Sequence, residues 1–235
     1  MEARDAFRKT PLLAACQVAP EIFEQVIPRL STFMKPFVTI CPGQAADQHA
    51  KTSVCGLLAD IERTKVASIA SRCGPSRLPL HGVIGWGAWD DAPWRPAVRD
   101  HVKTHVGQAD GVLVCEPSGV PQSGRESVGV ARQWGGRLGT VDHCQGALSV
   151  GSVSSKGHTL VATRRYRPQA WTPETARWAK AGGPTARRGS RTRHQLAWEM
   201  LAHNGAGLPH GGLAGDDERG RPSWFRRRLA ALGER

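Results

Sequence analysis

The chain has 235 residues, a formal net charge of +12 and a sequence pI near 10.2. Hydrophobic residues make up 40% of it, enough for a folded core, which argues against wholesale disorder. It has no apolar run approaching about eighteen residues and no apolar stretch in residues 1–10, so we expect neither a membrane span nor a signal peptide.

The first part of the chain, residues 1–105, has the pattern of a mostly helical domain. The clearest helix is predicted over residues 46–62, where apolar side chains recur at helical spacing. The predicted apolar stripe of this helix consists of Ala50, Val54, Leu57, Leu58 and Ile61. Further helices are predicted over residues 21–34, where Pro28 would bend or cap the helix, and over residues 65–71.

Residues 74–96 are rich in glycine and proline and predict an irregular connector. Trp86, Trp89 and Trp94 lie within it. Such tryptophans can stack on nucleic-acid bases, but they more often anchor a loop to the body of the protein. Pro93 and Pro96 then predict the start of a helix that continues to about Val106.

The second part begins with strand patterns. An apolar run over residues 111–116 ends at Glu116 and predicts a buried strand. Two more strands are predicted over residues 144–153 and 159–163, joined by a hairpin turn at residues 154–157. A loop rich in glycine, proline and arginine follows over residues 168–190.

The C-terminal pattern alternates helix and strand. Thr192 is a suitable N-cap for a helix whose apolar side holds Leu196, Ala197, Met200 and Leu201. A short strand over residues 212–215 then ends at Asp216. A last helix is predicted from Pro222 to Gly233, with an apolar face made of Trp224, Phe225, Leu229 and Leu232.

Three successive strands, a helix, a fourth strand and a helix form the opening of a ribonuclease-H-like α/β fold. We therefore expect two domains, a helical one over residues 1–105 and an α/β one over residues 106–235. The fold takes a fifth strand after the last helix, and the chain ends at Arg235, where that strand would begin. The expected α/β domain is thus incomplete, with its fifth strand missing.

Two carboxylates stand at the predicted strand ends. Functional groups of α/β proteins gather at the carboxyl ends of strands, and Glu116 and Asp216 occupy such positions. Carboxylates on neighbouring strands can hold a pair of divalent cations for phosphodiester displacement, and Mg²⁺ prefers such oxygen ligands. By spacing alone, a solvated turn residue at Glu116 and a plain acidic loop over residues 216–218 are the simpler interpretation.

The basic charge lies mostly in the second part. Residues 101–235 carry twenty of the thirty-two Lys and Arg residues, and seventeen of these twenty are Arg, which suits phosphate contacts. A GC-rich genome that favours Arg codons is the alternative explanation. The densest basic loop holds Arg187, Arg188, Arg191 and Arg193. Arg132 and Gln133 follow a short strand-like run and are candidates for contacts with DNA.

A series of short motifs resembles the DDE domain of one group of bacterial insertion-sequence transposases. The motifs occur in the order of that family over residues 105–235, with a looser likeness in the helical part. They are DGVLVCEPSG at 110–119, SVGVARQ at 127–133, DHCQ at 142–145, SKGH at 155–158, RHQLA at 193–197 and AGDDE at 214–218.

The resemblance implies roles for individual residues. Glu116 stands at the position of the first metal-binding Asp of the family, Asp216 matches the second acid, and the third acid, a Glu, would lie beyond Arg235. The implied cofactor is Mg²⁺ or Mn²⁺, weakly held or not bound. Glu in place of Asp moves the carboxylate by about 1 Å, whereas such a constellation requires about 0.5 Å.

Three further residues read as departures from a well-formed strand pattern. Arg165 and Arg167 stand where apolar or small side chains are expected, and Gly146 would weaken the pairing of its strand. An exposed edge of the sheet would account for either departure. Together with the missing strand, they suggest a gene fragment that has drifted without strong selection.

The resulting expectation is a cytoplasmic, nucleoid-associated bacterial DDE transposase. It would cleave and join double-stranded DNA at transposon ends, with a possible homodimer as the active form and impaired catalysis in this copy. The scattered cysteines, with no C-x-x-C pair, agree with a reducing cytosol. Two alternatives remain, namely a DNA-binding fragment that occupies transposon ends without cutting, and a decayed product that does not function.

Overall fold

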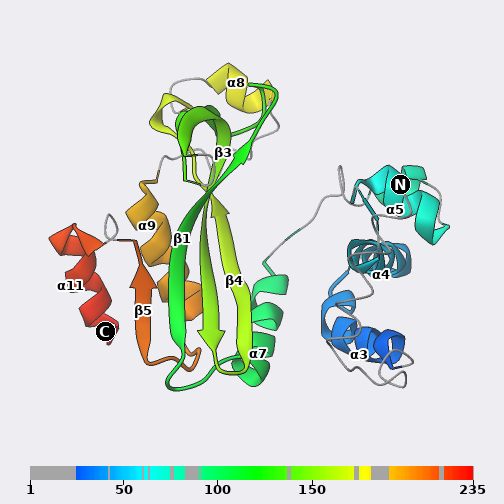
Figure 1. The fold of residues 1–235 in the computed structure, drawn as a ribbon, viewed down its shortest axis with the longest axis horizontal. Coiled ribbons are helices and arrows are strands. Elements are labelled where there is room, and N and C mark those ends of the chain that lie inside the picture. The colour runs from blue at the N-terminus through cyan, green and yellow to red at the C-terminus, as the bar shows by residue number, and fades with distance from the viewer. Residues whose placement is uncertain are drawn as a thin grey trace, which may run out of the picture. The chain divides into compact units, whose positions relative to one another are not determined.

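The computed structural model describes residues 25–41, 43–59, 61–62, 64–74, 77–82, 90, 92–136, 139–171, 175–180, 191–216 and 220–234. The chain divides into two compact units, residues 1–91 and 92–235 (Figure 1). Across these described ranges, no helix combines the length and the apolar character that a bilayer crossing requires.

The first unit is helical in its described residues. Its helices are α3 (Val26–Val38), α4 (Gln44–Leu58), α5 (Val66–Cys73) and α6 (Arg77–His81). Ile69, Ala70 and Leu80 form a small buried cluster, against which Ile61 and Val66 pack. The helical character expected for this part of the chain is therefore confirmed.

Helix α4 packs differently from the predicted apolar stripe. Leu57 and Leu58, which belong to that stripe, are 59% and 68% exposed. Gly56 is buried instead, and a Cβ added to it would clash with Ile69 Cγ2 on α5. The prediction that Leu57 and Leu58 lie on the buried face of α4 is wrong. Because Gly56 has no side chain, α5 packs closely against α4 at Gly56 instead.

Two other expectations in this part lie at the limits of the described residues. Helix α3 begins at Val26 and continues past the predicted end to Val38, while residues 21–24 lie outside the described ranges. Trp86 and Trp89 of the expected connector also lie outside them. The helix predicted after Pro93 is confirmed as α7 (Trp94–His105), which belongs to the second unit.

The second unit is built on a mixed five-stranded sheet. Its strands are β1 (Val112–Pro121), β2 (Val130–Gly135), β3 (Thr140–Ser154), β4 (Gly157–Arg165) and β5 (Gly212–Gly215). Strands β1, β3 and β4 form an antiparallel meander, and β5 lies parallel to β1. The three predicted strands, their hairpin turn and the later short strand are confirmed as elements. The predicted end of the first strand at Glu116 is wrong, because β1 continues to Pro121 along β3 and Glu116 lies within it.

Strand β2 was not predicted at its observed bounds, and it shares one edge of β3 with β4. β1 pairs with residues 144–153 along one side of β3. Along the other side, β2 pairs with residues 140–145 and β4 with residues 147–154, so β2 and β4 lie end to end. Gly146 lies at the junction, where its carbonyl accepts a hydrogen bond of 2.8 Å from the Tyr166 backbone N–H.

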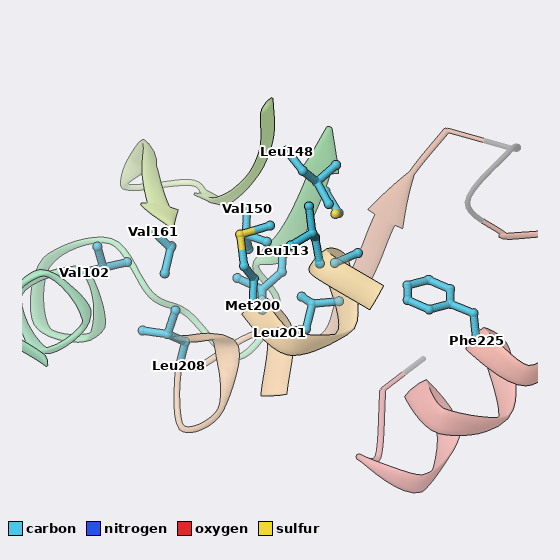
Figure 2. Close-up of a cluster of buried hydrophobic side chains, with 12 residues drawn as sticks. Val102, Leu113, Leu148, Val150, Val161, Met200, Leu201, Leu208 and Phe225 are labelled. Carbon is cyan, nitrogen blue, oxygen red and sulfur yellow. The ribbon is translucent and has the colours of Figure 1, made fainter. Parts of the chain in front are cut away.

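The core of this unit lies on one face of the sheet, under α7, α9 (Arg193–Met200), the π-helical turn η4 (Leu201–Gly205) and α11 (Ser223–Ala231). Figure 2 shows Leu113 of β1 among side chains from β3 and from α9 and η4. The predicted apolar side of α9 is confirmed, since Leu196, Ala197, Met200 and Leu201 are all buried. Thr192 is its N-cap, with a full capping box to Gln195.

The segment after β4 forms a second small core. It contains the 3-10 turn η2 (Gln169–Trp171) and α8 (Thr175–Lys180), and Trp171 and Trp178 are buried together with Val128. The Arg167 guanidinium lies 4.6 Å from the centre of the Trp178 ring. Arg167 is buried, and the tryptophan face offsets part of the cost expected for burying its charge.

Candidate functional site

The acidic pair expected from the sequence comes together through the parallel pairing of β1 and β5. Cys115 pairs with Gly215 at the last position of that register. Glu116 and Asp216 are the next residue on each strand, at the point where β5 ends and β1 continues. Glu116 is exposed and Asp216 is half-buried. Neighbouring strands lie about 4.8 Å apart, so the backbone at positions 116 and 216 lies side by side.

Glu116 faces away from the hydrophobic core. Side chains alternate along a strand, and Leu113 and Cys115 point into the core, so Glu116 belongs to the opposite face. Its partner on β3 is Ser149, which shares a hydrogen bond of 3.0 Å with Thr163 on β4. We call this side of the sheet the open face, because Glu116, Thr163, Val153 and Leu160 are all exposed on it.

The chemistry of the pair fits a hard divalent cation. Carboxylate oxygens are the ligands that Mg²⁺ prefers, and Mg²⁺ is often held by one or two carboxylates together with water and substrate phosphates. Within the described ranges, no group of three or more His, Cys, Asp or Glu side chains could hold a metal ion. The site is thus a two-carboxylate one in these residues, and Asp217 and Glu218 lie outside them.

Two of the predicted DNA-binding residues, Gln133 and Arg193, contact each other. The Gln133 amide nitrogen donates to the Cys144 carbonyl at 2.7 Å, and Arg193 donates to the Gln133 side-chain oxygen at 3.5 Å. The Arg193 guanidinium also lies 4.7 Å from the centre of the Tyr166 ring. Both side chains therefore take part in holding β2, β3 and the start of α9 together.

Gly146 makes room for the Gln133 side chain. A Cβ at Gly146 would lie 3.0 Å from the Gln133 side-chain oxygen, closer than an ordinary contact. The pairing of β3 is interrupted at Gly146 between β2 and β4, and the missing side chain there also allows the Gln133 amide to lie across β3.

Arg191 is paired with an acid. Its Nε lies 2.9 Å from Glu199 Oε1, and Arg164 lies 3.4 Å from the other oxygen of the same carboxylate. Glu199 therefore joins β4 to the segment before α9. Arg187 and Arg188, the other members of the predicted basic loop, lie outside the described residues.

Arg132 and Arg165 are cations on the open face. Both are exposed, and neither forms an ion pair with another residue of the described ranges. Arg165 pairs with Ala147 of β3, which pairs with Ser118, two residues beyond Glu116. The Arg165 Cδ lies 3.6 Å from where a Gly129 Cβ would be, so its stem follows the backbone while its charge stays exposed. Arg165 is therefore exposed, which is the alternative that the sequence left open for it.

The fold and the acidic pair together define a class of protein. An antiparallel meander, a helix and a strand parallel to the first form an α/β domain, in which the two acids follow the last paired positions of the parallel strands. The model of the DDE superfamily endonuclease family matches residues 36–234, and the chain belongs to this family. Its fold is accordingly ribonuclease-H-like.

The family gives the coarse function. Its members are nucleases of the DNA-transposition type, they act on DNA, and they use divalent metals. Searches of curated proteins and of solved structures returned no match to this chain.

Proposed function

We propose that this chain is a DNA transposase in which Glu116 and Asp216 hold Mg²⁺ or Mn²⁺ for cleavage and strand transfer at transposon ends. The observation that carries the proposal is the parallel register, because Cys115 pairs with Gly215 and the two acids follow directly. Metal-dependent phosphodiester displacement requires carboxylates on adjacent strands facing a surface that DNA can reach, and Glu116 is exposed on the open face.

The chain's own residues supply binding and orientation. Two neighbouring carboxylates repel a phosphodiester. Arg165 on the same face offsets that repulsion, and Arg132, farther along the sheet, holds the DNA backbone. Ser149 and Thr163 form a hydroxyl pair next to Glu116 that can donate to a phosphate oxygen. When bound, the metal activates the attacking oxygen and stabilises the leaving oxygen.

We further propose that catalysis in this copy is impaired. Glu116 stands where the resembling transposases have Asp, and its additional methylene moves the carboxylate by about 1 Å, beyond the tolerance of about 0.5 Å for such a site. The same observation favours a second candidate function, a protein that occupies transposon ends on DNA without cutting them. In this function, Arg132 and Arg165 on the open face would contact DNA. The other residues predicted from the sequence to contact DNA are Gln133, Arg187, Arg188, Arg191 and Arg193.

The test is a combined binding and cleavage assay on a labelled transposon-end duplex, with Mg²⁺ or Mn²⁺ and with EDTA. Glu116→Asp should raise the cleavage rate, and Asp216→Asn should abolish cleavage without reducing affinity in EDTA. Glu126→Gln is the matched control, because Glu126 is a surface acid paired with Lys180, away from the proposed site. It should leave both activities unchanged.

The outcomes separate the two functions. Cleavage that survives Asp216→Asn would contradict the metal site. Salt-sensitive binding with no cleavage, even by Glu116→Asp, would establish the non-cutting DNA-binding protein as the better description. Aggregation without any binding would contradict both.

A further inference from the structure

Beyond the end of β1, the sheet continues as a two-stranded ribbon. Residues 140–143 of β3 extend past Cys144, the partner of Pro121, and form strand pairs only with β2 in the described part of the chain. Residues 130–135 and 140–145 make up this ribbon. Gly135 lies close to Gly119 of β1, since a Cβ added to Gly119 would be 3.4 Å from the Gly135 Cα. The ribbon therefore bends toward the core side of the sheet, and its other side faces outward.

The outer side of the ribbon carries two cross-strand pairs. Arg132 pairs with His143, and Trp134 pairs with Val141. By alternation along β3, His143 and Val141 are on the same face as Ser149, and hence as Glu116. Trp134 is 60% exposed and Val141 is 47% exposed. An exposed tryptophan and valine next to an exposed arginine are typical of a binding surface, because large apolar side chains are usually buried unless a partner covers them.

We propose that the outer side of this ribbon enters a groove of duplex DNA, with Arg132 on a phosphate and Trp134 against the sugars and base edges. This proposal rests on the proposed function, because it names the residues that contact the DNA on which the acidic site acts. The major groove, about 12 Å wide, admits a two-stranded β-ribbon. The charge of the chain, +12 overall, complements that partner.

The register also fixes how far from the acidic pair this contact lies. Ser149, the partner of Glu116, and His143, the partner of Arg132, are six residues apart on β3. At about 3.4 Å per residue this is about 20 Å along the strand, and the bend can only shorten it. Duplex DNA rises about 3.4 Å per base pair. The ribbon therefore contacts DNA within about six base pairs of the phosphate at Glu116.

The first experiment measures DNA affinity by fluorescence anisotropy in EDTA, where cleavage plays no part. Trp134→Ala should weaken binding about tenfold, as expected for the loss of a large apolar side chain at an interface, and Trp134→Phe should restore most of it. Arg132→Gln should lower the slope of log affinity against log salt by about 1. Leu232→Ala and Arg227→Gln are the matched controls, since both residues are exposed on or next to α11. They should bind like the wild type.

The second experiment replaces Trp134 or Ser149 with a photo-crosslinking amino acid and maps the bases that each captures. The two sets of bases should lie within about six base pairs of each other. Wild-type affinity for both Trp134→Ala and Arg132→Gln, or crosslinks farther apart, would overturn the ribbon contact while leaving the acidic site intact. A wild-type chain that binds no DNA would overturn the proposed function as well.

Discussion

His210 and Glu234 share a hydrogen bond of 2.7 Å between Nε2 and Oε2, which joins the segment before β5 to the end of α11. Nδ1 of the same ring lies 2.7 Å from the Leu208 carbonyl oxygen. Both ring nitrogens thus face acceptors, and only the protonated imidazolium can donate to both. Both side chains are 13% exposed, so the pair is shielded from solvent screening.

This pair should make the stability of the second unit depend on pH. Burial lowers the pKa of His210, but the hydrogen bonds to Glu234 and Leu208 and the charge of Glu234 outweigh it, so the pKa is raised above 6.5. A raised folded-state pKa gives stability that is fully present below about pH 6.5 and is lost as pH rises through the folded value.

Urea unfolding at pH values from about 5.5 to 8 measures this. Glu234→Gln should flatten the loss of stability that the wild type shows above about pH 6.5. Glu126→Gln serves as the control, because its partner Lys180 does not titrate in this range. Identical pH profiles for Glu234→Gln and the wild type would contradict the role of the pair.

Gly146→Ala should destabilise the second unit by about 1 to 3 kcal/mol, as overpacking of a buried position does. The added Cβ meets the Gln133 amide, which is held by Cys144 and Arg193 and cannot move freely. In a Gln133→Ala background the same change should cost less, and a double-mutant cycle measures the difference. Additive effects would show that the cost arises from the strand itself.

Gly56→Ala should destabilise the first unit in the same way. A Cβ there would clash with Ile69 Cγ2, so α4 and α5 would have to separate. The expected loss is about 1 to 3 kcal/mol, and it should become smaller in an Ile69→Ala background. Amide exchange within α5 reports this, and exchange in β1 should stay unchanged, since β1 belongs to the other unit.

Thr192→Ala should cost about 1 kcal/mol, the usual cost of losing a helix N-cap. The Thr192 hydroxyl accepts from the Gln195 N–H at 3.1 Å, and the Gln195 side chain accepts from the Thr192 N–H at 2.8 Å. Thr192→Ser preserves the hydroxyl and should preserve stability. Thermal unfolding compares the two variants, and equal losses for both would contradict the capping role.

The local patterns of the sequence predicted much of this fold. The hairpin turn at residues 154–157, the cap at Thr192 and the short strand before Asp216 all depend on neighbouring residues, and all are confirmed. The predicted end of the first strand at Glu116 is wrong, because pairing with β3 carries β1 on to Pro121. The α/β order is confirmed for the same reason. The pairing of β1 with β5 then follows from the parallel connection, and it brings the two predicted acids side by side.

What the sequence did not reveal depends on contacts between distant residues. Strand β2 was seen only as a short run before Arg132, because its pairing is set by the unusual length of β3. The sequence indicates only that Gly146 weakens its strand, whereas in the structure the Gln133 amide lies against it. The ring that lies against the Arg167 guanidinium belongs to Trp178 of α8, eleven residues further along the chain, so the strand pattern around Arg167 gives no sign of it. No local period encodes such relationships.

The parallel strand β5 also determines when the acidic pair can form during folding. Strands β1, β3 and β4 follow one another along the chain and assemble through a tight hairpin and local pairing, whereas β5 must close a crossover that runs through α9. A chain that has formed only the meander presents Glu116 without Asp216. If the two acids hold the metal as proposed, cleavage of DNA requires this long-range closure as well as the meander.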